Sequence, residues 1–288
     1  MSEPLLVADH VSKVFSMGGL FGRGSFKAVD DVTFTLTEGR PEIFTIIGES
    51  GSGKTTLSRM ILSTSKPSSG AIRFRGRDVS TIRGRKAKLA FMAEVQPIFQ
   101  NPFEAFNPLK RVDRYLFMSA RRFAGARNRE DIERRSDEVL QQVGLSLAEI
   151  QGRFPHELSG GQLQRTAIAR ALISRPALIV ADEPVSMVDA SLRMSIVNLF
   201  KTLRDDLNVS IIYITHDLAT AYYISDRLMI MRKGNVIEEG DARAILANPQ
   251  HPYSIQLKDA VLSPEAATDG SPRRRAPATS AVFIPDTS

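Results

Sequence analysis

The chain has 288 residues, of which 42% are hydrophobic and 24% charged, with a formal net charge of +6; this is ordinary for a soluble protein of one large or two modest domains. It has no cysteine, which excludes disulfides, thiolate metal sites and cysteine-bound iron–sulfur clusters. There is no signal-peptide pattern and no apolar run near the roughly 20 residues of a spanning helix, so we expect any membrane role to be peripheral.

The first hundred residues alternate apolar strand patterns with turns. Strands are predicted at residues 5–7, 11–15, 28–36, 43–47, 71–74 and 95–99. The glycine-rich stretch 17–25 predicts a loop, and a helix is predicted at 56–62. Pro97 weakens the prediction of the last strand, because proline cannot donate a ladder hydrogen bond.

The phosphate loop is the strongest single motif. It is formed by Gly48, Glu49, Ser50, Gly51, Ser52, Gly53, Lys54 and Thr55, with Thr56 opening the helix that follows. The spacing Gly-x4-Gly-Lys-Thr between a strand and a helix is typical of a loop whose backbone N–H groups hold a polyanion. Lys54 would then reach the β- and γ-phosphates, and the Thr55 hydroxyl would bind Mg²⁺.

The second half starts with a different composition. Residues 101–108 are irregular, and an amphipathic helix is predicted at 129–143 and ended by Gly144, which indicates a mostly helical insertion. Helices and strands then alternate, which implies a parallel sheet covered on both faces. The helices are predicted at 161–174, 190–206 and 218–224, and the strands at 177–181, 209–215 and 227–231. Two short helices follow, to about residue 262, and 264–288 has the composition of a disordered tail.

Two carboxylates end the strand at 177–181. Asp182 at this strand end would hold Mg²⁺ through water, and Glu183 would orient or deprotonate an attacking water. The alternative, an acid pair that caps the next helix, is less consistent with a phosphate loop in the same chain.

A second helix start able to bind an anion follows Leu158. Ser159 is a natural N-cap, and Gly160, Gly161 and Gln162 open the helix. One nucleotide needs no second site unless two chains share it, and the residues alone favour a simply capped helix.

Taken together, these motifs resemble ATP-binding cassette proteins over about residues 5–240. Residues 158–162 are similar to the family signature, and 48–55 and 178–183 to its two nucleotide motifs. The resemblance assigns further residues. Gln100 corresponds to the family's glutamine loop, Asp189 to the aspartate of its Ser-Ala-Leu-Asp loop, His216 to its switch histidine, and Phe15, with Phe26 as the competing candidate, to the aromatic that stacks on adenine.

The resemblance implies an α/β fold, a P-loop NTPase (RecA-like) core with an antiparallel β subdomain and an inserted α-helical subdomain. The expected core comprises residues 1–100 and 161–240, and the helical signature subdomain 101–160. A C-terminal extension spans 241–263, before the tail at 264–288.

Segments outside the shared motifs resemble the oligopeptide/dipeptide and nickel import ATPases. They are Gln100-Asn101-Pro102-Phe103, Asn107-Pro108, Glu238-Glu239-Gly240 and His251-Pro252-Tyr253. The chain departs from the family at Met187 and Val188, which replace Ala and Leu, and at Asn101, where Asp is common. Without cysteine it cannot hold the C-terminal cluster of some members.

The resemblance implies an ATPase that works as a head-to-tail dimer, in which the serine-headed helix of one subunit closes over ATP held by the other. Glu183, His216 and Gln100 would be catalytic, and Mg²⁺ would be bound by Thr55, Gln100 and Asp182. The expected partners are permease subunits, a second identical or paralogous ATPase subunit and, indirectly, a solute-binding protein, at the cytoplasmic face of the cell membrane. Import of peptides is the leading expectation; the alternatives are oligosaccharide or nickel import and, less favoured, a non-transport ATPase acting on nucleic acid, which is not an expected partner.

Overall fold

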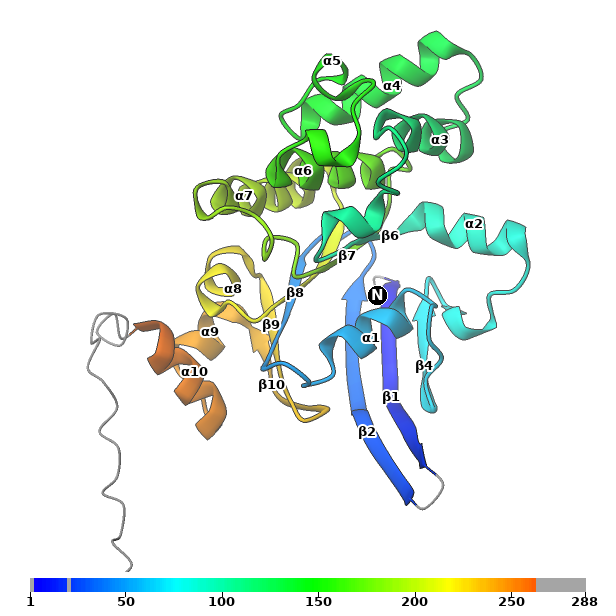
Figure 1. Cartoon of the computed structure of the whole chain (residues 1–288). Coiled ribbons are helices and arrows are strands. Elements are labelled where there is room, and N and C mark those ends of the chain that lie inside the picture. The colour runs from blue at the N-terminus through cyan, green and yellow to red at the C-terminus, as the bar shows by residue number, and fades with distance from the viewer. Residues whose placement is uncertain (1–2, 20–21, 263–288) are drawn as a thin grey trace, which may run out of the picture.

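The computed structural model describes residues 3–19 and 22–262 (Figure 1). The tail predicted to be disordered, 264–288, lies outside the described residues. Within the described part of the chain, no helix is both long and apolar enough to cross a membrane.

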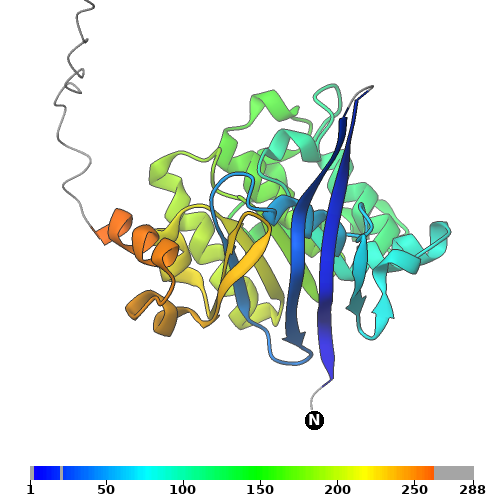
Figure 2. The same ribbon diagram turned by 90° about the horizontal axis from the view of Figure 1, so that it is seen from below.

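An antiparallel sheet is built from the N-terminal strands, in the order β2-β1-β4-β5. They are β1 (Pro4–Gly19), β2 (Gly22–Thr37), β4 (Ser69–Phe74) and β5 (Arg77–Asp78). Figure 2 shows β1 and β2 as a long ribbon of two strands that run side by side. The strands predicted at 5–7 and 11–15 are parts of β1, which irregular pairing between Ala8 and Val14 interrupts.

The loop predicted at 17–25 is wrong for most of its length. Met17 pairs with Gly24 and Gly19 with Gly22, so the ladder continues through the glycine-rich stretch. A run of glycines has no alternating side chains to indicate a strand, whereas strand pairing uses only backbone groups.

A second sheet has six strands in the order β10-β9-β3-β8-β7-β6. They are β3 (Ile43–Ile47), β6 (Val95–Ile98), β7 (Leu178–Asp182), β8 (Ser210–Thr215), β9 (Arg227–Arg232) and β10 (Asn235–Asp241). All neighbours pair in parallel except β9 and β10. Pro97 is tolerated because β6 is an edge strand, where a missing N–H leaves no partner unsatisfied. β10 was not predicted, since polar residues dominate it.

Helices cover the six-stranded sheet and extend beyond it, as Figure 1 shows for α3, α4 and α5. The α-helices are α1 (Lys54–Ile61), α2 (Arg85–Glu94), α3 (Asp113–Phe123), α4 (Arg129–Gln142), α5 (Leu147–Ile150), α6 (Gly160–Leu172), α7 (Ala190–Leu207), α8 (Leu218–Ile224), α9 (Ala242–Ala247) and α10 (Pro252–Leu262). Short 3-10 turns lie at Val79–Thr81, Pro102–Ala105 and Pro155–Glu157. The sequence analysis missed α2, α3 and α5. None of the residues of α2 is fully buried, and only Ala87 and Phe91 are half-buried hydrophobic residues packed against the core, so its pattern is weak.

The two faces of the six-stranded sheet belong to different cores. Phe44 and Ile46 of β3 pack with α1 and the antiparallel sheet, whereas Ile43 packs with residues of α3, α4, α6 and α7. Alternate residues of β3 thus pack into the two different cores on the opposite faces of the sheet. The predicted α/β fold with a sheet covered on both faces is confirmed.

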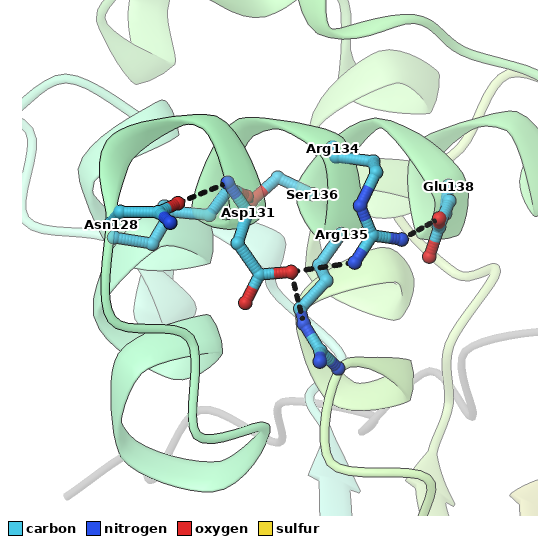
Figure 3. Close-up of polar contacts among 7 residues, drawn as sticks. Asn128, Asp131, Arg134, Arg135, Ser136 and Glu138 are labelled. Carbon is cyan, nitrogen blue, oxygen red and sulfur yellow. Dashed lines mark hydrogen bonds and ion pairs between the residues drawn. The ribbon is translucent and has the colours of Figure 1, made fainter.

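Ion pairs run along α4 and involve its three arginines, Arg129, Arg134 and Arg135. Figure 3 shows Asp131 accepting from Arg134 at 2.5 Å and from Arg135 at 2.9 Å, while Arg134 also pairs with Glu138. Asn128 caps the helix by accepting from the Asp131 N–H at 2.8 Å. These arginines therefore already have carboxylate partners.

Asp226, between α8 and β9, connects the start of β3 to α7. Its carboxylate accepts from the Ile43 N–H at 2.7 Å and from the Arg204 guanidinium at 2.5 and 2.6 Å, and its own N–H donates to the Ile43 carbonyl at 3.0 Å. This anchor fixes the beginning of the strand that leads into the phosphate loop.

Replacing Asp226 by alanine is expected to lower the free energy of unfolding by about 1–2 kcal/mol, because hydrogen bonds to a charged acceptor are lost. Asp205→Ala is the matched control: Asp205 also pairs with Arg204, at 2.7 Å, but its side chain is 54% exposed, so its loss should cost less than about 0.5 kcal/mol. Denaturant unfolding measures both, and equal losses would contradict the anchoring role.

Candidate functional site

The backbone of the phosphate loop depends on glycine at two close approaches. A Cβ on Gly48 would lie 2.1 Å from the Met231 carbonyl oxygen, and a Cβ on Gly53 would lie 2.2 Å from that of Ala28. Gly53, the N-cap residue directly before α1, also has φ of +105°. β9 and β2 thus pack directly on the loop, and an anion would bind at the N–H groups where the loop enters α1.

Lys54 lies across the inside of the loop. Its Nζ donates to the carbonyl oxygens of Gly48 at 2.6 Å and Glu49 at 2.9 Å, and the residue is only 6% exposed. Burial lowers the pKa of Lys54, while the carboxylates of Glu183, Asp182 and Glu49 oppose this shift. The net result is a desolvated cation beside the loop, which suits contact with a polyphosphate.

Asp182 ends β7 beside α1, and the Ser58 hydroxyl donates to it at 3.4 Å. Burial raises the pKa of Asp182, whereas a hydrogen bond from Thr55 lowers it. Asp182, Thr55 and Gln100 line the same cavity of about 460 Å³. These are oxygen ligands of the kind that Mg²⁺ prefers, and in the described residues no three His, Asp or Glu side chains converge on one point. The donor set fits an Mg²⁺ that takes its other ligands from phosphate and water.

Glu183 links the two other predicted catalytic residues. One carboxylate oxygen accepts from Gln100 Nε2 at 3.2 Å, and the other lies 3.0 Å from His216 Nδ1. Glu183 has φ of +47°, and its N–H donates to the Ile214 carbonyl at 2.8 Å. A left-handed non-glycine residue is strained by roughly 1–3 kcal/mol, so a backbone bond from β8 holds this carboxylate in an unfavourable conformation beside the loop.

A cavity of about 750 Å³ brings these groups together. It is lined by the phosphate loop from Glu49 to Thr56, by Gln100, Glu183 and His216, and by both candidate aromatics. Phe15 and Phe26 are cross-strand partners on β1 and β2, 45% and 49% exposed. The two residues proposed as alternatives are therefore adjacent, and both rings border the same space.

The remaining predicted site residues do not line this cavity. Ser159 caps α6: its hydroxyl accepts from the Gln162 N–H at 3.2 Å, and the Gln162 side chain accepts from the Ser159 N–H at 3.1 Å. Gly161 packs against Leu192 so closely that a Cβ would lie 2.9 Å from its Cδ1. Asp189 is exposed at the start of α7. Ser159 and Asp189 thus present polar groups on the surface, away from the phosphate loop of the same chain.

Tyr253 is a residue of the site whose position the sequence analysis missed. Its hydroxyl accepts a hydrogen bond from the Glu49 N–H at 2.9 Å, directly on the phosphate loop. The only signal in the sequence was the His-Pro-Tyr triplet, which indicated a subfamily and not a contact.

Comparisons with known proteins show which proteins this chain is similar to. The family model described as ABC transporter matches residues 29–186. The oligopeptide transport ATP-binding protein AppF of Bacillus subtilis (strain 168) is 38% identical over 278 residues, which cover 94% of this chain and 82% of that protein. The oligopeptide transport ATP-binding protein OppF of Escherichia coli (strain K12) is 38% identical over 84% of this chain and 71% of its own length. A solved dimer of the ATP-binding cassette MJ0796, in a post-hydrolysis state bound to ADP and Pi, has a TM-score of 0.72 and 27% identity, and covers 83% of this chain and 99% of its own.

Replacing Asp182 by asparagine is expected to stabilise the nucleotide-free protein. Because the pKa of Asp182 is raised in the folded state, its ionisation destabilises the fold: the penalty is absent below the unfolded-state pKa and complete above the folded-state pKa. The melting temperature of Asp182→Asn at pH 7 should exceed the wild-type value by about 2 °C, and the difference should shrink toward pH 4.

With Mg²⁺ and ATP present the order should reverse, since the wild type would gain more stability from the ligand than the variant does. The exposed Asp206→Asn, on α7, serves as the control and should leave both melting temperatures unchanged. A variant that is less stable than the wild type without nucleotide would contradict the burial argument.

Proposed function

This chain belongs to the ABC transporter family of ATPases, and we propose that it is the ATP-hydrolysing subunit of an importer that takes up oligopeptides through a membrane permease. The observation that carries the proposal is the single cavity bordered by the phosphate loop, Gln100, Glu183 and His216. The oligopeptide cargo is supported by the names of the relatives, each of which aligns with most of this chain.

ATP would enter the cavity with its triphosphate on the loop N–H groups and Lys54, and with adenine against Phe15 or Phe26. Thr55, Asp182 and Gln100 would hold Mg²⁺, which neutralises charge on the phosphates. The Glu183 carboxylate would accept a proton from the attacking water; the water oxygen bonds to the γ-phosphorus as the bond to ADP breaks, so the products are ADP and phosphate. His216 and Gln100 orient Glu183 through the contacts at 3.0 and 3.2 Å.

The second half of the site would come from a partner ATPase, identical or paralogous. Residues 159–162 and Asp189 lie outside the cavity of their own chain, and a capped helix N-terminus favours an anion. In a head-to-tail pair the helix start of one subunit would face the triphosphate held by the other. The similar structure of MJ0796 is described as a dimer, which supports the same arrangement here.

The helical region around α3, α4 and α5 would transmit closure of this pair to permease subunits at the cytoplasmic face of the membrane. A solute-binding protein on the other side of the membrane would supply the cargo to the permease. A larger affinity for ATP than for ADP in the closed pair would drive the motion.

Uptake measurements test the cargo. Cells that express this chain with its cognate permease and solute-binding protein are given labelled oligopeptides, oligosaccharides or Ni²⁺. ATP-dependent accumulation of peptides alone supports the proposal, and accumulation of only one of the other solutes would replace it.

Glu183→Gln is expected to lower ATP turnover by at least about a hundredfold, because the proton acceptor is lost. The variant should still bind ATP and, with Mg²⁺, should accumulate as a dimer in analytical ultracentrifugation. Adding Ser159→Arg should abolish that dimer, since a bulky cation would stand where the helix start closes over the phosphates.

The control is Glu130→Gln, an exposed acid on α4, which should turn over ATP at the wild-type rate. Unchanged turnover in Glu183→Gln would disprove the role of this carboxylate. A Glu183→Gln variant that binds ATP but never pairs, even with the permease present, would disprove the shared site.

A further inference from the structure

We propose that Tyr253 is a positioning residue for the phosphate loop, through which the C-terminal extension sets the affinity of the site for ATP. The inference rests on the proposed function of this cavity as an ATP site. It assigns a role within that site to the segment from β10 to α10, which lies outside the matched family region at 29–186.

The central contact holds Glu49 from two sides. Its N–H donates to the Tyr253 hydroxyl at 2.9 Å, while its carbonyl oxygen accepts from Lys54 Nζ at 2.9 Å. The backbone groups on both sides of the Glu49 Cα are thereby fixed. Tyr253 and the lysine that would contact the phosphates are thus connected through one residue.

Tyr253 is itself rigidly held. It is 7% exposed and belongs to an apolar cluster with Ile47, the residue that precedes Gly48. The Arg232 guanidinium lies 4.6 Å from the centre of its ring and 3.7 Å from the Glu49 carboxylate. Arg232 thus contacts both the loop and the tyrosine that holds it.

The start of α10 is fixed from β10. Glu238 accepts hydrogen bonds from the backbone N–H groups of Gln250, at 2.9 Å, and His251. His251 Nδ1 in turn accepts from the Tyr253 N–H at 3.0 Å. These contacts fix the backbone at the start of α10, from which the Tyr253 side chain reaches the loop.

The hydroxyl also remains neutral over the working pH range, because burial raises the pKa of Tyr253 above its ordinary value near 10. A neutral phenol accepts from the Glu49 N–H without adding a negative charge next to the Glu49 carboxylate and the triphosphate. An ionised group at this position would repel the ligand that the loop is built to hold.

Tyr253→Phe tests the inference, because it removes the hydroxyl and keeps the ring under Arg232. The dissociation constant for ATP with Mg²⁺ is expected to rise about two- to tenfold, as the loss of one hydrogen bond that pre-organises the loop implies. The turnover number at saturating ATP should stay within about twofold of wild type, since the proposed catalytic contacts of Glu183 are untouched.

Tyr223→Phe is the matched control. The Tyr223 hydroxyl also makes a hydrogen bond, to Asn198 at 2.7 Å, and Lys201 also lies over its ring, at 4.4 Å, but Tyr223 does not contact the loop. This variant should bind ATP with the wild-type affinity. Equal dissociation constants for the two variants would overturn the proposed role of Tyr253.

Amide hydrogen exchange without nucleotide gives an independent measurement. Peptides that cover residues 44–54 should exchange faster in Tyr253→Phe than in the wild type or in Tyr223→Phe, and an equal rate would overturn the inference even if ATP affinity changed. If the wild type bound no ATP while the loop still loosened in Tyr253→Phe, the proposed function would fail and the contact with the loop would stand.

Discussion

The fold is organised around the need to hold a polyanion with backbone groups. A loop that turns its N–H groups inward requires glycine where other strands approach it, and Gly48 and Gly53 would each clash with a carbonyl oxygen if they carried a Cβ. Lys54, buried across the same loop, adds a charge that burial disfavours and three nearby carboxylates favour. The loop is thus held by β3, which leads into it, by β2 and β9, which pack on it, and by its own lysine.

The two acids of the site come from the end of β7, which is separated from β3 by one strand, β8. β7 delivers Asp182 and Glu183 next to α1, because β3 and β7 both pair with β8 in parallel and their carboxyl ends meet at one edge. Glu183 is then held by Gln100 from the end of β6 and by His216 from the end of β8. The ends of four neighbouring strands, β3, β8, β7 and β6, therefore carry the groups of the proposed site. The two cores, one on each face of the sheet, hold these strands in place.

The C-terminal extension belongs to the same assembly. α10 packs on α8, and its Tyr253 hydroxyl accepts a hydrogen bond from the phosphate loop. In the proposed reaction cycle, an ATPase that must open and close around nucleotide gains from a fixed support for its loop, since a pre-organised anion site loses less entropy on binding.

The sequence by itself determined the elements with strong local patterns and the residues of the site that motifs identify. β3 and α8 were predicted residue for residue, because each has a clear apolar pattern and clear end signals. Only the tertiary structure showed that the glycine-rich stretch after Met17 pairs as strands, that residues 85–94 form the helix α2, and that the Phe15 and Phe26 rings border one cavity. It alone brought Tyr253 to Glu49, because a hydrogen bond between residues 204 positions apart depends on the packing of β9 and α10 and leaves no trace in any local pattern.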